Sequence, residues 1–213
     1  MPISDFRQSY DDAPSFDVGD LADSPFDQFQ TWFKDAVDAD IIEPNAMTLA
    51  TVDCDGQPDA RIVLLKDMDE RGFTFYTNYD SAKARQLGAH AQATLVFYWD
   101  KLFRQIRIKG EVTKVARDEA QAYWQTRPIK SQLGAIASNQ SQTLNNRQQL
   151  EDAFKAAVDE HGTDGPIPLP SDWGGYRVIP SAIEFWQGQR SRLHDRLVYV
   201  RDAEDWQVKR LAP

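Results

Sequence analysis

The pattern of apolar positions changes from helical to strand-like early in the chain. Behind Ser24 and Pro25, a typical N-cap and first helical position, apolar side chains recur at helical spacing at Phe26, Phe29, Phe33 and Val37. Segments rich in β-branched and aromatic residues, several of them separated by turn signals, then predict strands at 46–52, 60–66, 73–78, 93–99, 102–115, 175–179, 197–201 and 206–209. The short connections favour antiparallel pairing, and so many strands favour a closed or nearly closed barrel.

Helices are predicted within this run of strands, at 81–87, 118–126, 130–137 and 143–160. A loop rich in Gly and Pro follows at 162–170. Residues 1–23 are acidic and lack periodic apolar positions, so we expect a mobile N-terminal arm with Tyr10 and Phe16 as possible anchors. The remainder, 24–213, is predicted to be a single domain that is mainly β with helices, in the α+β class.

The charge balance limits the partners that this protein can have. A net charge of −9 and a pI of about 4.8 disfavour nucleic acid or an anionic membrane, although a local cationic cleft can still attract a small anion. Cys54 is the one cysteine and is expected to be incidental, and the three histidines are too far apart in the sequence to suggest a metal site. Neither a signal peptide nor an apolar run of about 18 residues is apparent, so we expect a cytoplasmic protein.

Candidate chemistry is concentrated near the C-terminus, in residues 183–196. If this segment is an extended strand, Arg192, His194 and Arg196 project to one side at intervals of roughly 7 Å. Two fixed cations beside a titratable imidazole suit an anion, and the nearby Trp186 adds a flat apolar wall. These residues predict a site for a flat, anionic ligand that carries a ring.

Two further groups of residues suit a phosphate. Lys83 follows Ser81 at a predicted helix N-terminus, where backbone N–H groups and the helix dipole attract anions. The alternative is an ordinary N-cap beside a solvated lysine. Tyr123, Arg127 and Ser131 lie four apart and offer hydroxyl and guanidinium donors, unless they are scattered polar residues of the surface.

Other strands carry isolated candidates. Arg61 and Lys66 bracket one predicted strand, but strict alternation puts them on opposite faces, so a shared site requires a bulge or the end of the strand. Gln105 can donate and accept hydrogen bonds, which suits the edge of a heteroaromatic ring, although a solvated polar face explains it as well. The remaining candidates are Gln140-Ser141 and the segment Trp173-Gly174-Gly175, whose glycines permit close backbone approach.

From about residue 24 to Pro213, the chain resembles the pyridoxine (pyridoxamine) 5′-phosphate oxidases. The run 183–196 is close to the family signature and is the most specific part of the resemblance. The other stretches that carry it are residues 61–66, Phe75-Tyr76-Thr77-Asn78, Arg104-Gln105, Tyr123, Arg127-Pro128, Ser131-Gln132, Trp173-Gly174-Gly175 and the ending Lys209-Arg210-Leu211-Ala212-Pro213.

The resemblance implies an antiparallel split β-barrel homodimer that binds FMN at the subunit interface and shares its active sites between subunits. It implies oxidation of pyridoxamine 5′-phosphate and pyridoxine 5′-phosphate to pyridoxal 5′-phosphate, with reduction of O2 to hydrogen peroxide. The FMN contacts that it implies are Arg61, Ile62, Val63, Leu64, Leu65, Lys66, Tyr76, Thr77, Lys83, Gln105, Gln140, Ser141, Trp186 and Arg196. The substrate contacts that it implies are Lys66, Tyr123, Arg127, Ser131, Arg192, Leu193 and His194, of which Arg192 and His194 are the catalytic candidates.

The mechanism expected from this resemblance is hydride transfer from C4′ of the substrate to the flavin, with the protein supplying position and charge. His194 is the natural proton handler, because an imidazole titrates near neutrality. Family members often carry a basic residue where this chain has Ala82, so a weaker grip on the FMN phosphate is expected. Two alternatives stay open: a related split-barrel flavin reductase, against which the Arg192-Leu193-His194 element argues, and a non-catalytic binder of FMN or pyridoxal phosphate.

Overall fold

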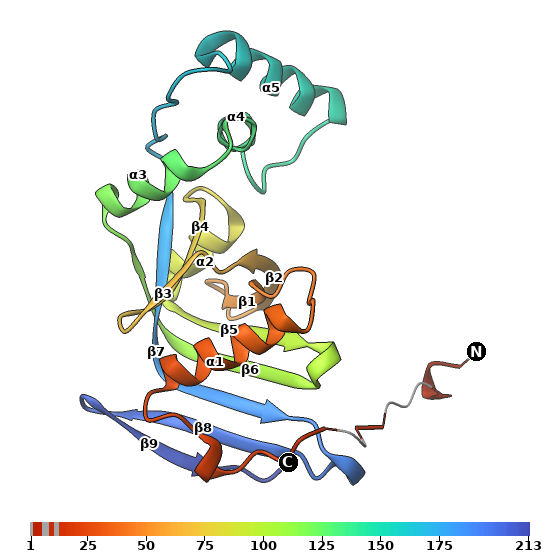
Figure 1. Cartoon of the computed structure of the whole chain (residues 1–213). Coiled ribbons are helices and arrows are strands. Elements are labelled where there is room, and N and C mark those ends of the chain that lie inside the picture. Colours follow the sequence, from red (N-terminus) through yellow and green to blue (C-terminus); the bar gives the residue numbers. More distant parts are fainter. Residues whose placement is uncertain (1, 6–8, 11–12) are drawn as a thin grey trace.

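The computed structural model describes residues 2–5, 9–10 and 13–213, which form an antiparallel sheet with several helices, an α+β fold (Figure 1). Its strands are β1 (Ala46–Val52), β2 (Pro58–Leu64), β3 (Asp67–Asp69), β4 (Gly72–Asn78), β5 (Gln92–Trp99), β6 (Arg104–Lys114), β7 (Trp173–Gln187), β8 (Asp195–Asp202) and β9 (Asp205–Arg210). Its α-helices are α1 (Pro25–Asp38), α2 (Ala82–Ala89), α3 (Arg117–Thr126), α4 (Ile129–Ala137) and α5 (Arg147–His161), and short 3₁₀ turns lie at η1 (Ile3–Asp5), η2 (Val18–Asp20), η3 (Asp100–Leu102) and η4 (Arg190–Arg192). No helix among the described residues combines the length and the apolar character that crossing a membrane requires.

The long strand β7 organises the sheet, whose order is β2-β1-β5-β6-β7-β4-β3 with β8 and β9 added beside β7. The first part of β7 pairs with β4, from Trp173 opposite Asn78 to Val178 opposite Phe73. Its last part pairs with β8, while β6 runs along both parts. β7 thus has β6 on one side, and on the other side β4 along its first part and β8 along its last part. Its two ends therefore lie in different regions of the molecule, with α3 near its start and β8 near its end (Figure 1).

The strand predicted at 175–179 is longer than the sequence pattern indicated, since β7 spans Trp173–Gln187. Pro180 interrupts the pattern, but it lies where the register between β6 and β7 shifts, so its missing N–H breaks no regular ladder. Gly110 permits this close crossing, because a Cβ at that position would lie 2.0 Å from the carbonyl oxygen of Ile179.

Helix α1 packs its apolar face against the barrel core. Ser24 is its N-cap, as predicted, and its hydroxyl oxygen accepts from the N–H of Phe26 at 3.2 Å. Phe26 and Phe29 are buried as expected, but Val37 is 50% exposed, so the predicted stripe is wrong at its C-terminal end. Ala36 is fully buried instead, because the face of the helix that meets the sheet runs through Trp32 and Ala36.

A smaller apolar cluster fixes α3, α4 and α5 against the start of β7, with Trp124, Leu133, Ile167 and Trp173 at its centre. In the N-terminal arm, Phe16 is buried and its ring lies 4.9 Å from that of Trp32. The mobility predicted for residues 1–23 stays a prediction, and residues 1, 6–8 and 11–12 of the arm lie outside the described part of the chain.

Candidate functional site

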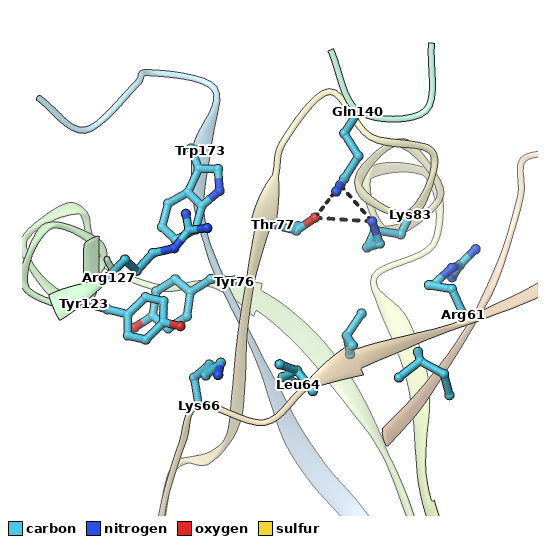
Figure 2. A pocket seen from close by; sticks show the side chains of 12 residues that line it. Arg61, Leu64, Lys66, Tyr76, Thr77, Lys83, Tyr123, Arg127, Gln140 and Trp173 are labelled. Atoms are coloured by element: carbon cyan, nitrogen blue, oxygen red, sulfur yellow. Dashed lines mark hydrogen bonds between the residues drawn. The ribbon is translucent and has the colours of Figure 1, made fainter. Parts of the chain in front are cut away.

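A pocket of about 290 Å³ lies between the end of β2, β4, α2 and α3 (Figure 2). Most of the site residues predicted from the first two thirds of the chain line this pocket. Its lining residues are Arg61, Ile62, Val63, Leu64, Lys66, Tyr76, Thr77, Lys83, Tyr123, Arg127, Gln140 and Trp173. An adjoining pocket of about 410 Å³ shares Tyr76, Thr77, Arg127, Gln140 and Trp173 with it and adds Ser131.

Arg61 and Lys66 reach the same pocket because the strand ends between them. β2 stops at Leu64, so the alternation of side chains no longer applies at Lys66, whose N–H donates to the carbonyl oxygen of Thr74 at 2.9 Å. The strand-end condition set by the sequence is therefore met. Leu65 is buried in the core and does not line the pocket, and its N–H donates to the carbonyl oxygen of Asn45 at 2.8 Å.

Lys83 lies in a buried polar group at the start of α2. Its ammonium donates to Gln140 Oε1 at 2.9 Å and to Thr77 Oγ1 at 3.3 Å (Figure 2). Burial, reinforced by the positive charge of Arg61, lowers the pKa of Lys83 to about 8. A buried ammonium held by neutral oxygens favours an anionic ligand, because the added negative charge offsets part of the cost of its desolvation.

The N-terminus of α2 is capped by serine side chains from two segments. Ser81 is the N-cap of the helix, and its hydroxyl oxygen accepts from the N–H of Ala84 at 3.4 Å. This is the ordinary capping role that the sequence analysis gave as the alternative to a phosphate site. Ser141 Oγ accepts from the N–H of Ala82 at 3.1 Å, so this predicted FMN contact lies at the same helix end without lining the pocket. Because the N–H groups of Ala82 and Ala84 already have these partners, an anion at this helix end would meet the ammonium of Lys83 and the positive end of the helix dipole.

The opposite side of the pocket is aromatic and carries Arg127. The rings of Tyr76 and Tyr123 stack with centroids 3.9 Å apart at an angle of 14°. Burial raises the pKa of Tyr76 to about 12 and also raises the pKa of Tyr123, so both hydroxyls stay protonated at neutral pH. Arg127 Nη2 donates to the carbonyl oxygen of Ser131 at 3.0 Å, while its Nη1 is buried without a partner. A phosphate at this point would satisfy that donor.

A second group of predicted residues lies at the other end of β7. Gln105, Trp186 and Arg196 are opposite one another on β6, β7 and β8, so they form one transverse row on the same face of the sheet. Arg196 is fixed by the buried Glu184, whose carboxylate accepts from Arg196 Nε at 2.8 Å and from Arg107 at 3.1 Å.

His194 stands against the ring of Trp186, with the ring centroids 4.5 Å apart. Its Nδ1 accepts from the N–H of Gln189 at 3.0 Å, which leaves Nε2 to carry the proton of the neutral ring. Burial, together with the positive charge of Arg192, lowers the pKa of His194. His194 is therefore suited to donate a hydrogen bond from Nε2 at neutral pH. Tyr10 lies edge-on to the His194 ring at 5.6 Å.

The extended strand predicted through Arg192 and His194 is wrong, because β8 begins only at Asp195. Arg192 ends the turn η4, and both Ser191 and Arg192 have left-handed backbone angles, with φ of 56° and 60°. The bond from Gln189 N–H to His194 closes this turn and competes with a straight continuation of the strand. Arg192 and Leu193 are consequently exposed at the tip of the turn.

Within one chain, the two groups of residues do not form a common pocket. Trp173 begins β7 and Trp186 comes near its end, a separation of roughly 40 Å along a fully extended strand. Figure 1 shows β8 and the end of β7 far from α3. The turn that carries Arg192, Leu193 and His194 therefore contributes no side chain to the pocket of its own chain.

Trp173 is a pocket residue that the sequence analysis did not include among the predicted contacts, although the segment Trp173-Gly174-Gly175 was noted. The signal was the glycine pair: a Cβ on Gly175 would lie 2.8 Å from the ring of Tyr76. Because Tyr76 and Gly175 are cross-strand partners, the tyrosine ring lies over the glycine and meets Trp173.

Most of this chain matches known protein families. Residues 33–159 match the pyridoxamine 5′-phosphate oxidase family, and residues 173–213 match the pyridoxine 5′-phosphate oxidase C-terminal dimerisation region. Pyridoxine/pyridoxamine 5′-phosphate oxidases of Paraburkholderia phytofirmans and Paraburkholderia xenovorans are each 53% identical over 213 residues, with 99% of both chains covered.

Two solved structures have the same fold. PhzG from Burkholderia lata 383, in complex with tetrahydrophenazine-1-carboxylic acid, is 30% identical over 95% of this chain and 99% of its own, with a TM-score of 0.88. A pyridoxamine 5′-phosphate oxidase-related, FMN-binding protein from Nostoc punctiforme, 18% identical, covers 89% of this chain and 98% of its own with a TM-score of 0.74. The predicted antiparallel split barrel of the α+β class is thereby confirmed, and the chain carries the dimerisation region that such a homodimer requires. With two family regions matched and relatives identical at half of all positions, this chain belongs to the pyridoxamine 5′-phosphate oxidase family of oxidoreductases.

Proposed function

We propose that this protein binds FMN and oxidises pyridoxamine 5′-phosphate and pyridoxine 5′-phosphate to pyridoxal 5′-phosphate. The amine would consume O2 and water and release ammonia and hydrogen peroxide, whereas the alcohol would consume O2 and release hydrogen peroxide. The observation that carries the proposal is one pocket with two cationic sides, Arg61 and Lys83 on one and Lys66 and Arg127 on the other, in a protein with a net charge of −9. Two phosphate-bearing ligands bound side by side would use both.

The residues present fit FMN. The buried ammonium of Lys83, held by neutral oxygens, and the helix end beside it suit the FMN phosphate, with Arg61 and Gln140 nearby. When bound, FMN supplies the two-electron oxidation of the substrate and passes the electrons to O2. The remaining proposed contacts to it are Ile62, Val63, Leu64, Lys66, Tyr76 and Thr77, which line the pocket, then Leu65 and Ser141, which lie beside these residues without lining it, and Gln105, Trp186 and Arg196.

The substrate phosphate would be held on the aromatic side. Lys66, Tyr123, Arg127 and Ser131 offer donors there, and the unpaired Nη1 of Arg127 supports this assignment. Arg192 and His194 would hold the substrate ring, with His194 donating from Nε2 and Leu193 in contact beside them. We do not assign His194 as an obligatory base, because its Nδ1 is already bonded to Gln189.

A homodimer would complete each site. The matched dimerisation region contains the row of Trp186 and Arg196 and the turn with Arg192 and His194. In a twofold dimer, surfaces meet reciprocally, so this group of one subunit can face the pocket of the other. The separation of the two groups within a chain supports active sites shared between subunits.

Anaerobic titration of the purified protein tests this function. Pyridoxamine 5′-phosphate should bleach the flavin absorbance, and subsequent air should restore it with formation of hydrogen peroxide. Bleaching by NADPH but not by pyridoxamine 5′-phosphate would favour the flavin reductase alternative. A yellow protein that neither donor reduces would indicate a binder without catalysis, and a colourless protein that does not take up FMN would refute the proposal.

A further inference from the structure

Arg127 is held by aromatic rings. Its guanidinium carbon lies 4.6 Å from the ring centroid of Trp173 and 5.1 Å from that of Trp124. Burial lowers the pKa of Arg127, as expected for a cation removed from water. Rings that face a guanidinium leave its in-plane N–H groups available, and here one Nη2 bonds to Ser131 while Nη1 remains unpaired.

Trp173 is itself fixed from several directions. Its ring is nearly parallel to those of Tyr76 and Tyr123, with angles of 8° and 6° and centroids 5.5 and 6.2 Å away. The ring of Trp124 meets it edge-on at 4.8 Å. Its carbonyl oxygen accepts from Arg117 Nη1 at 2.8 Å, which anchors the first residue of β7. The indole is thus a rigid surface, buried to 95%.

We propose that Trp173 is a positioning residue that orients Arg127 toward the phosphate of the substrate. This inference rests on the proposed function, since it names the group that sets the geometry of its phosphate site. An arginine side chain has several rotatable bonds, and a ring stacked on its guanidinium removes much of that freedom before the ligand arrives. Both indoles belong to the same apolar cluster, but Trp173 lines the pocket and lies nearer the guanidinium, whereas Trp124 does not line the pocket.

The test compares Trp173→Leu and Trp173→Phe with a matched control. Trp206→Leu removes the ring of another arginine–tryptophan contact, Arg201 over Trp206 at 5.0 Å, in β8 and β9. All holoenzymes are assayed at saturating FMN for KM and kcat with pyridoxamine 5′-phosphate and with unphosphorylated pyridoxamine. Equilibrium dialysis of pyridoxal 5′-phosphate, and the Kd for FMN, provide readouts that do not depend on turnover.

Trp173→Leu should raise the KM for pyridoxamine 5′-phosphate and the Kd for pyridoxal 5′-phosphate by roughly 5- to 30-fold, the range of a desolvated cation–π contact. The ratio kcat/KM for unphosphorylated pyridoxamine and the Kd for FMN should change by less than about twofold, because neither depends on Arg127. Trp173→Phe should recover most of the loss, and Trp206→Leu should show none of it. In an Arg127→Lys background, Trp173→Leu should add less than about twofold, as expected for two residues that act as a unit.

Several results would overturn the inference while leaving the proposed function intact. These are an unchanged KM in both Trp173 variants, additive effects of Trp173→Leu and Arg127→Lys, or an equal loss with the unphosphorylated substrate. Should Trp173→Leu fail to fold, Trp173→Met, which also removes the ring but fills more of its space, takes its place alone and with Arg127→Lys, with the same expected changes and the same overturning results. Failure of the unaltered protein to oxidise pyridoxamine 5′-phosphate would instead refute the proposed function.

Discussion

The two groups of site residues differ in how the fold holds their cations. In the pocket, Lys83 bonds to neutral oxygens and Arg127 lies against indole rings, so their positive charge remains available to a ligand. At the far end of β7, Arg196 is paired with Glu184, and Asp195 accepts from Arg210 at 2.9 Å. In the first region, Lys83 and Arg127 keep their charge for an anion, although Arg61 is paired with Asp59, whereas in the second region Arg196 is held by a carboxylate.

The two regions also differ in the backbone that carries them. Most of the pocket residues lie on β2, β4, α2 and α3 or directly beside them, so their positions follow from the sheet and its helices. Arg192 and His194 depend on a turn with two left-handed residues, tied by Gln189 to His194 and by Gln189 Nε2 to the carbonyl oxygen of Pro14 at 2.6 Å. The difference implies that the cationic pocket is assembled within the sheet and its helices, while the turn that carries Arg192 and His194 also depends on a contact with the N-terminal arm.

The largest expected effect is that of Arg192→Leu. We expect kcat/KM for pyridoxamine 5′-phosphate to fall on the order of 100-fold, because a misplaced substrate ring loses its alignment with the flavin. FMN should remain bound, since Arg192 is proposed to contact the substrate and not FMN. Steady-state assays with FMN content measured by absorbance check this, with Arg147→Leu on the exposed face of α5 as control. An unchanged kcat/KM would remove Arg192 from the catalytic assignment.

Lys83→Met tests the pocket. We expect the Kd for FMN to rise roughly 10- to 100-fold, because a charge-assisted hydrogen bond to the phosphate is lost. Fluorescence quenching of FMN on binding measures the Kd, and Lys155→Met, a change of an exposed lysine on α5, is the control. Equal Kd values in the two variants would show that Lys83 does not bind the FMN phosphate.

The pocket should also respond to pH. Free Lys83 has a pKa of about 8, below its ordinary value, so the ammonium form that binds an anion is depleted as pH rises. FMN affinity should therefore fall about tenfold between pH 7 and pH 9. Lys83→Arg should abolish the dependence over this interval, because arginine stays charged. A flat Kd in the unaltered protein would contradict the assignment.

Glu184→Gln tests the restraint on the second region. The carboxylate is buried and serves Arg107 and Arg196, so its neutral replacement should lower the free energy of unfolding by about 2 kcal/mol. FMN affinity should fall by roughly threefold to tenfold through the displacement of Arg196. Denaturant unfolding of the FMN-free protein separates the two effects. Unaltered FMN affinity together with lower stability would make Glu184 purely structural.

The smallest effect concerns His194. Its lowered pKa keeps the imidazole mostly neutral between pH 6.5 and pH 8. The ionisation of His194 should therefore change kcat/KM for pyridoxine 5′-phosphate, measured at saturating FMN, by less than about threefold over this interval. The profile of His194→Asn provides the reference for ionisations of the substrate. A limb with a midpoint near pH 7 that disappears in His194→Asn would instead make His194 a proton acceptor.

Local sequence signals predicted several features of helix α1 and of the pocket. The cap at Ser24 was correct because capping depends on neighbouring residues. Arg61 and Lys66 were recognised as needing a strand end, and β2 provides one. The interior stripe of α1 was wrong at Val37, since the facing sheet decides which side of a helix is buried.

The sequence by itself determined the antiparallel barrel and the residue types of the site, because turn signals, hydrophobic alternation and capping act over a few residues. Only the tertiary structure decided that β7 continues through Pro180, that Arg192 and His194 lie on a turn, and that Trp173 meets Arg127. These outcomes depend on partners far along the chain: the register with β6, the arm at Pro14, and the rings of Tyr76 and Tyr123. A pattern read over a short window contains no information on such partners, so their geometry had to come from the packed fold.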